Sequence, residues 1–267
     1  MKKNINVIKN FLKQNLNPKL KKFLKKILKR NVTSNFPYIN NNEEFSLNFE
    51  VNNSIEEFRL TNWGGEKEYT VKMVKNFKED DVVYDIGSSV GLVSVISASI
   101  VKNGKVISFE PDPENIKRLK NNYFINDLTN YEIKEMAVGE TQGKLKLFTK
   151  GSNGNSPSLK PVNGIESFIE TEVNSIDYLI SQKEIPYPDV IKIDIEGAEI
   201  IALKGMKNLL SSDKRPRLIF IEIHPEFLPS FGSNTEDIFE LLGKYDYKFV
   251  EKIETHNQIL CKLESNI

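Results

Sequence analysis

The chain has 267 residues, of which 39% are hydrophobic, and this suffices for one catalytic domain with its own core and an extension. Lys plus Arg and Asp plus Glu are equal at 37 each, and the single cysteine, Cys261, excludes an internal disulfide and a cysteine-rich metal site. One cysteine fits a reducing compartment, and no apolar stretch resembles a secretory signal or a membrane span, so we expect a cytoplasmic protein.

The first 30 residues are strongly basic. They contain eleven Lys or Arg residues and no acid, which leaves 26 basic and 37 acidic residues in the remainder. Apolar residues recur there at helical spacing with lysines opposite, and Pro18 after Asn17 divides the segment into two amphipathic helices. Such helices contact an anionic membrane surface, bind a partner, or pack on their own domain with solvated lysines. Nucleic acid is not expected, because no aromatic stacking pattern or zinc spacing accompanies the lysines.

Residues 31–65 form a second segment, rich in asparagine. Phe45, Leu47 and Phe49 alternate with polar neighbours, which predicts an added hairpin or cover over the domain. The catalytic domain is then expected over residues 66–267, beginning with a helix over Glu66–Phe77 whose first acid interacts with the helix dipole.

A glycine-spaced turn follows the apolar run that begins at Val82. Gly87 and Gly91 allow backbone to approach a ligand, and a helix over Val93–Val101 would direct its free N–H groups toward it. The dinucleotide fingerprint requires a glycine where this chain has Ser89. Asp85 at the strand end would repel a pyrophosphate and suits a ligand with a cationic amino-acid head, such as S-adenosylmethionine.

Glu110 supplies the second half of a nucleoside site. It follows the strand Val106–Phe109 and comes 23 residues after Gly87, the spacing at which a carboxylate holds a ribose diol. Pro111 begins the turn into the next helix. Each feature alone has a plain alternative, since a glycine pair can be a turn and an acid before proline can be a helix cap, but together they indicate a nucleoside cofactor.

Strands and helices continue to alternate after Glu110. The pattern predicts a third strand over Tyr131–Ala137, with adenine expected at Met136 and Ala137, and an extra strand over Lys144–Phe148. The polar stretch 151–164 is either a substrate loop or lid, or a plain disordered loop.

The C-terminal segment closes the sheet. Thr235 is expected to cap a helix to Gly243, and Lys248–Ile253 and Gln258–Leu263 flank a turn at residues 255–257 as an antiparallel hairpin. The predicted fold is a doubly wound α/β domain with a mostly parallel, seven-stranded Rossmann-like sheet, and its ligand lies at the carboxyl ends of the strands. This hairpin is foreign to most dehydrogenases.

Three more blocks carry a family likeness: Val173–Leu179, Ile191–Glu199 with Leu203–Gly205 behind it, and Ile221–His224. With the glycine loop they make residues 66–224 resemble the FkbM-type S-adenosylmethionine-dependent methyltransferases, whose Lys-Ile-Asp-Val-Glu-Gly-Ala-Glu signature is close to the second block. The family usually has Ala-Asn where this chain has Ser88–Ser89. The resemblance implies methylation of a hydroxyl on a glycan, lipid-linked saccharide or natural product. The expected cofactor residues are Asp85, Gly87, Ser88, Gly91, Glu110, Pro111, Ala137 and Asp194.

Acids and a histidine follow the fourth and fifth strands. Asp194 and Glu196 lie two apart at one strand end, Glu222 and His224 at the neighbouring one, so each pair shares a face. The group could hold a sugar diol, supply a general base or bind a divalent cation. We expect catalysis by Asp194, His224 and Glu222, with Asp194 or His224 as the base, the histidine because its ordinary pKa is near 6.5. Structurally, Glu196 and Glu199 could instead cap the next helix.

A bound metal is not expected, although a divalent cation at Asp194, Glu196, Glu222 and His224 remains an alternative. Two functions from different classes follow: an O-methyltransferase, and a non-catalytic cofactor-binding scaffold that recruits a partner through its basic arm. A dehydrogenase is opposed by Ser89 and by the terminal hairpin. The acceptor, the methylated atom, the oligomeric state and the role of residues 1–30 are not determined by these patterns.

Overall fold

The main sheet has seven strands in the order β11-β12-β10-β9-β3-β4-β5. The structure is a computed structural model that describes residues 30–36, 45–52, 54–62, 67–148, 168–254 and 258–265. All strands are parallel except β12, which runs antiparallel to both β10 and β11. This order confirms the predicted doubly wound sheet with its closing hairpin. The strands are β3 (Val82–Ile86), β4 (Lys105–Phe109), β5 (Tyr131–Lys134), β9 (Val190–Ile193), β10 (Leu218–Ile223), β11 (Tyr247–Glu254) and β12 (Ile259–Ser265).

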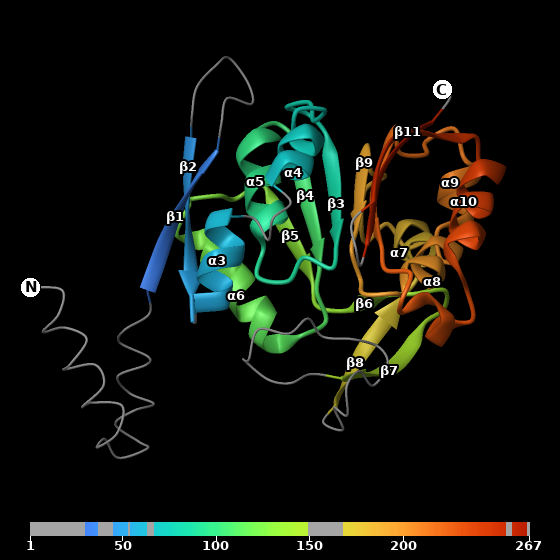
Figure 1. Cartoon of the computed structure of the whole chain (residues 1–267), viewed down its shortest axis with the longest axis horizontal. Helices are drawn as coiled ribbons and strands as arrows, with labels where there is room; N and C mark the ends of the chain where they lie inside the picture. The colour runs from blue at the N-terminus through green and yellow to red at the C-terminus, as the bar shows by residue number, and fades with distance from the viewer. Residues whose placement is uncertain are drawn as a thin grey trace, which may run out of the picture.

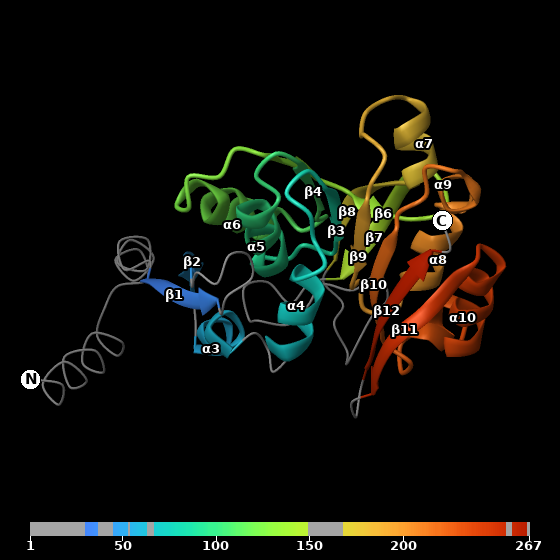
Figure 2. The ribbon, with the colours of Figure 1, turned by 90° about the horizontal axis from the view of Figure 1, so that it is seen from above.

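Helices cover both faces of this sheet (Figures 1 and 2). Successive strand residues alternate between two cores: Val83 and Val106 join one cluster, Tyr84 and Ile107 the other. The first cluster includes helices α4 (Lys67–Val74), α5 (Leu92–Ile100) and α6 (Pro113–Phe124). The second includes α7 (Ile176–Ser181), α8 (Glu199–Lys204), α9 (Lys207–Ser211), the 3-10 turn η2 (Leu228–Phe231) and α10 (Thr235–Lys244).

A second, three-stranded sheet has the order β6-β8-β7, with β6 (Ala137–Val138), β7 (Gly143–Phe148) and β8 (Phe168–Asn174). The predicted extra strand is therefore confirmed as β7. The predicted strand Tyr131–Ala137 is wrong in its extent, because β5 ends at Lys134 and Ala137 pairs with Val173 in the small sheet. The chain turns there because the Lys134 carbonyl accepts hydrogen bonds from the amides of both Glu110 and Met136.

The predicted N-terminal hairpin is present as β1 (Arg30–Phe36) and β2 (Phe45–Val51), followed by a helix that the sequence did not indicate, α3 (Ser54–Asn62). Phe49 and Leu60 are buried in the same cluster as α4, α5 and α6, so the hairpin and α3 pack on the domain. The basic helices of residues 1–29, Glu66, the loop 151–164 and the turn 255–257 lie outside the described residues. The boundaries at residues 30 and 65 stay predictions.

Side chains cap the first turns of α6, α7 and α10. The cap of α10 is Asn234, not Thr235 as predicted, because Asn234 and Asp237 form a reciprocal capping box. In the block Val173–Leu179, Ser175 caps α7, and the Asp177 carboxylate accepts hydrogen bonds from two amides of the first turn of α9. That family block therefore joins α7 to α9.

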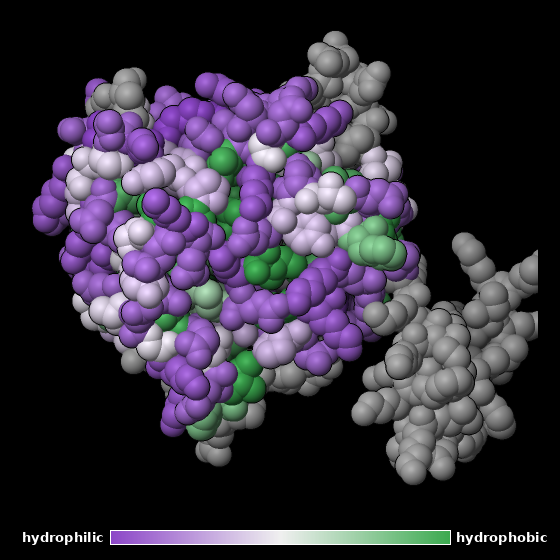
Figure 3. Space-filling view, turned by 180° about the vertical axis from the view of Figure 1, so that it is seen from behind, coloured by the Kyte–Doolittle hydropathy of each residue, from purple (hydrophilic) through white to green (hydrophobic). Residues whose placement is uncertain are grey.

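The surface offers little large apolar area on the face drawn in Figure 3, where hydrophobic residues form small patches between hydrophilic ones. Within the described ranges, no helix combines the length and apolar character that a bilayer crossing requires.

A buried ion pair fixes the N-terminal cover. Arg118 of α6 donates to both carboxylate oxygens of Glu56 in α3, each at 2.8 Å, and to the carbonyl oxygen of Glu50 at 3.1 Å. Both charged side chains are only 9% exposed. Removing one partner would leave the other charge buried and uncompensated, so the pair holds α3 against α6.

We expect Arg118→Met to lower the free energy of unfolding by about 3 kcal/mol, because the Glu56 carboxylate loses its charge partner. Adding Glu56→Gln should recover part of this loss. Urea unfolding measures both, and Lys120→Met on the same helix is the control, since its pair with Glu135 is about half exposed and should change stability by less than about 0.5 kcal/mol. An Arg118→Met protein as stable as the wild type would contradict this role.

Candidate active site

The glycine loop between β3 and α5 lies against neighbouring elements. Gly87 and Gly91 have φ of +85° and +93°. A Cβ on Gly87 would come within 1.9 Å of the Asp194 carbonyl oxygen, and one on Gly91 within 2.3 Å of Leu119 Cδ1. Gly87 lines the pocket, but both glycines are required first by the close approach of the loop to the end of β9 and to α6.

The loop amides are already bonded within the protein. The N–H groups of Gly87 and Ser88 both donate to the Phe109 carbonyl oxygen at 3.1 Å, and the Ser89 N–H donates to the Glu110 carboxylate at 2.7 Å. A dinucleotide site uses such amides to hold a pyrophosphate. This loop therefore favours a ligand without one, in agreement with the argument drawn from Asp85 and Ser89.

Glu110 faces the pocket from the end of β4. Its carboxylate also accepts hydrogen bonds from the Asp112 N–H at 2.9 Å and from Asn115 Nδ2 at 3.3 Å. Burial raises the pKa of Glu110, and these hydrogen bonds together with that from Ser89 only partly offset it, so the pKa is about 7. The carboxylate is thus held in place, and its charge depends on pH near neutrality.

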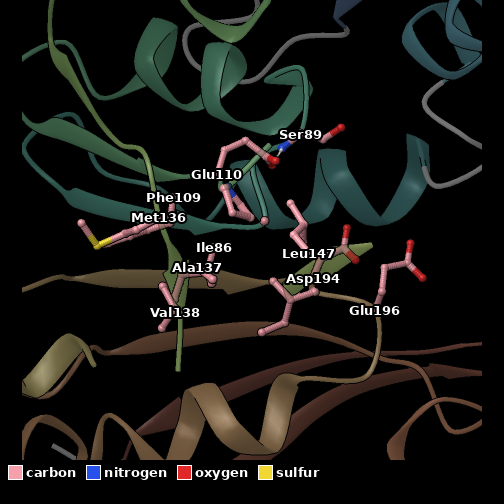
Figure 4. A pocket seen from close by; sticks show the side chains of 13 residues that line it. Ile86, Ser89, Phe109, Glu110, Met136, Ala137, Val138, Leu147, Asp194 and Glu196 are labelled. Atoms are coloured by element: carbon pink, nitrogen blue, oxygen red, sulfur yellow. Dashed lines mark hydrogen bonds between the residues drawn. The ribbon is translucent and has the colours of Figure 1, made fainter. Parts of the chain in front are cut away.

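One pocket joins Glu110 to the acids after β9. In Figure 4 the apolar side chains of Met136, Ala137 and Val138 lie on one side of Glu110, and the Asp194 and Glu196 carboxylates on the other. The small sheet closes the pocket with residues of β6 and β7. The lining residues are Ile86, Gly87, Ser89, Phe109, Glu110, Pro111, Met136, Ala137, Val138, Leu147, Asp194, Ile195 and Glu196.

Three predicted cofactor residues lie behind this lining. Asp85 is fully buried, where its carboxylate accepts a hydrogen bond from Ser94 and pairs with Lys192. The Ser88 hydroxyl lies 3.0 Å from the Asp85 carbonyl oxygen and 3.1 Å from that of Phe109, so it joins the ends of β3 and β4. Asp85, Ser88 and Gly91 thus lie outside the pocket lining, and direct cofactor contacts by them stay predictions.

The acids after β9 and in β10 lie around His224, as expected from the neighbouring positions of these strands. His224 Nε2 lies 3.3 Å from Glu222, 3.8 Å from Glu196 and 4.0 Å from Asp194. On the other side of the ring, Nδ1 lies 3.0 Å from Glu199, whose side chain is fully buried. Four carboxylates therefore surround one imidazole, and Asp194 and Glu196 alone among them line the pocket.

The charge of His224 differs from the expectation. Burial lowers the pKa of His224, but hydrogen bonds with Glu199 and Glu222 and the charges of Asp194 and Glu196 outweigh burial and raise it to about 11. The premise that His224 works with its ordinary pKa near 6.5 is therefore wrong. The imidazole is protonated at neutral pH and acts on its neighbours as a cation.

Sequence reasoning assigned no role to Lys192, which supplies the second cation. Its Nζ lies 3.1 Å from Asp194 and 3.5 Å from Asp85, and the side chain is 12% exposed. Burial lowers the pKa of Lys192, yet the charges of Asp194, Asp85 and Glu222 raise it above its ordinary value, so it stays charged. The sequence feature that could have revealed this role is the position of Lys192 within the apolar strand Val190–Ile193, because a lysine buried there requires a charged partner.

Asp194, Glu196 and His224 also satisfy the distance condition for a metal site. Ligand atoms from the three lie within 4.8 Å of one another. Carboxylate oxygens with one imidazole suit Mn²⁺ or Zn²⁺ as well as Mg²⁺. Two cations of the protein, Lys192 and His224, already compensate these acids in the structure.

The chain is similar to known methyltransferases over most of its length. Residues 81–249 match the family described as the Methyltransferase FkbM domain. Hexuronic acid methyltransferase AglP of Haloferax volcanii is 29% identical over 208 residues, covering 75% of this chain and 77% of that protein. The 2-O-methyltransferase NoeI of Sinorhizobium fredii is 23% identical over 184 residues, covering 63% and 74%.

Among solved structures, the FkbM methyltransferase of Methylobacillus flagellatus is similar with a TM-score of 0.49 and 21% identity; the match covers 70% of this chain and 44% of that one. The family match spans more than half of the chain and contains both the glycine loop and the acid cluster. The chain belongs to the FkbM family of methyltransferases.

Proposed function

We propose that this enzyme transfers the methyl group of S-adenosylmethionine to a hydroxyl of a saccharide, free or carried on a lipid or natural product. The observation that carries the proposal is the single pocket that joins Glu110 to Asp194 and Glu196. Two relatives bear the names of a hexuronic acid methyltransferase and a 2-O-methyltransferase, which supports a sugar-like acceptor and oxygen as the methylated atom.

The cofactor would extend along the pocket. Adenine would lie among Phe109, Pro111, Met136 and Ala137, and the ribose diol would donate to the Glu110 carboxylate. The cationic methionine end would then reach Gly87 and Asp194. Asp194 and Glu196, which line the other end of the pocket, would then be the residues available to the acceptor.

The acceptor would approach from the acid side. Sulfonium methyl donors are intrinsically reactive, so the protein must align the hydroxyl in line with the methyl group and accept its proton. Asp194 and Glu196 can hold neighbouring hydroxyls, while Glu222 and His224 fix their charge and position from behind. A carboxylate is the proton acceptor in this arrangement, because His224 is already protonated.

The reaction is proposed to need no divalent cation. His224 and Lys192 supply the positive charge that a metal would bring to Asp194 and Glu196. A divalent cation at Asp194, Glu196, Glu222 and His224 would have to displace the proton of the imidazole.

Cofactor affinity should depend on Glu110 and on pH. The ribose needs the ionised carboxylate, so lowering the pH below the Glu110 pKa of about 7 weakens binding: between about pH 8 and about pH 6 the affinity should fall about tenfold. Calorimetric titration with S-adenosylmethionine, its demethylated product and NAD measures this. Glu110→Gln should bind weakly, and the amino group of the ligand titrates in both proteins, so the variant isolates the Glu110 contribution. Tight NAD binding would contradict the proposal.

Turnover is tested with a panel of neutral oligosaccharides, uronic-acid saccharides and amino sugars. We expect one O-linked methyl group in the product, located by mass spectrometry, and equal rates with and without EDTA. Loss of turnover in EDTA that Mn²⁺ or Mg²⁺ restores would establish the metal alternative. Methylation of the amine of an amino sugar instead of a hydroxyl would contradict O-methylation.

The basic segment 1–30 is proposed to hold the enzyme near an anionic membrane, where lipid-linked saccharides are made. Eleven cations without an acid exceed what solubility requires. The full chain should sediment with vesicles containing phosphatidylserine and lose this at high salt, whereas a chain lacking residues 1–30 should remain in the supernatant. Equal sedimentation of both would remove the membrane contact from the proposal.

A further inference from the structure

The acid side of the pocket presents two carboxylates, and only one is needed to take the proton. Which carboxylate takes the proton is a question that rests on the proposed transfer to a hydroxyl. Asp194 and Glu196 follow the same strand, line the same pocket and are similarly exposed, at 30% and 27% of their side chains. They differ in the charges that hold them.

Asp194 lies between two cations, the buried His224 and the largely buried Lys192. Lys192 Nζ is 3.1 Å from one of its carboxylate oxygens, and His224 Nε2 is 4.0 Å from the other. Each cation is held from behind by a fully buried carboxylate, Asp85 for the lysine and Glu199 for the histidine. Asp194 is therefore held in place from two sides, each of its oxygens facing a different cation.

Glu196 is held differently. Within the described part of the chain its carboxylate has one charged contact, His224 Nε2 at 3.8 Å, and accepts no hydrogen bond. It therefore faces the pocket with its oxygens available to an acceptor hydroxyl. Figure 4 shows its carboxylate beside that of Asp194, on the side of the pocket away from Met136.

The backbone of Glu196 is strained. Its φ is +53°, a left-handed conformation that glutamate rarely adopts, and Gly197 follows at +98°. A Cβ on Gly197 would lie 2.5 Å from Phe227 Cβ, so the turn is packed tightly against the segment after β10. Strained residues of this kind persist where the surroundings hold them, and they concentrate at functional sites.

We propose that Glu196 is the general base of the reaction and that Asp194 is the fixed carboxylate that orients the acceptor. The acceptor oxygen forms a bond to the methyl carbon as the carbon–sulfur bond of S-adenosylmethionine breaks. The electron pair of that bond stays on sulfur, which becomes a neutral thioether, and the hydroxyl proton passes to a Glu196 oxygen. Solvent at the pocket mouth then takes this proton.

Kinetics of single variants test the assignment on an acceptor that the wild type methylates. Glu196→Gln should lower kcat by about 100-fold or more while leaving affinity for S-adenosylmethionine within about threefold, because only proton transfer is removed. Glu226→Gln, an exposed acid away from the pocket lining, is the matched control and should keep wild-type turnover.

Rescue by a small carboxylate separates the two acids. Formate should raise the kcat of Glu196→Ala by at least about tenfold, since it can occupy the vacated position and accept the proton. Asp194→Ala should gain nothing, because orientation of the acceptor is not replaced by a free anion. Rescue of Asp194→Ala alone, or full turnover by Glu196→Gln, would overturn the proposal.

Thermal unfolding, which needs no acceptor, tests Glu196 independently of the proposed function. If the wild type methylates no saccharide, the proposed function fails, whereas thermal unfolding still tests Glu196. Glu196→Asn should unfold at the wild-type Tm or up to about 4 °C higher, because asparagine tolerates positive φ and one charge leaves a crowded acid cluster. A Tm lower by more than about 4 °C would assign Glu196 a structural role and overturn its role as the base.

Discussion

The contact between Gly87 and the end of β9 fixes the position of the cofactor loop relative to the acid cluster. The Asp194 N–H donates to the Ile86 carbonyl oxygen at 3.0 Å, and no Cβ fits between Gly87 and the Asp194 carbonyl oxygen. β3 and β9 are neighbours at the point where the sheet order reverses, with β4 and β5 on one side and β10 on the other. Open α/β sheets bind their ligands at such a point, and any side chain at position 87 would separate the two halves of the site.

At this junction, acidic side chains on neighbouring strands are paired with a lysine that lies between them. Lys192, between Asp85 and Asp194, belongs to β9 and pairs in register with Asp85 of β3, so the two strands that form the junction also share an ion pair. Behind Asp85, hydroxyl groups of Ser94, Ser108 and Tyr123 continue the polar network into the core of that face. One Asp85 oxygen accepts the hydrogen bond from Ser94, while the other makes no hydrogen bond and faces Lys192 Nζ at 3.5 Å, so hydrogen bonds and charge together support the pocket.

The sequence predicted the sheet, the hairpin and the two halves of the pocket, because each leaves a local pattern: buried strands, a glycine pair, and acids at strand ends. The sequence could not reveal that Asp85 lies outside the pocket lining or that Tyr131–Ala137 divides between two sheets, since both depend on which groups meet after folding. The largest difference concerns His224. Its charge is set by four carboxylates, one of which, Glu199, lies at the start of α8 and was expected only as a possible helix cap.

Lys192 and His224 also affect the energetics of methyl transfer. A sulfonium loses its positive charge during methyl transfer, so an uncompensated cluster of acids would attract the substrate more than the transition state and would slow the reaction. Lys192 and His224 reduce that attraction, and each is paired with a fully buried carboxylate, Asp85 for the lysine and Glu199 for the histidine. The pocket thus keeps carboxylates that can orient hydroxyls and accept a proton, while the two cations compensate part of their negative charge.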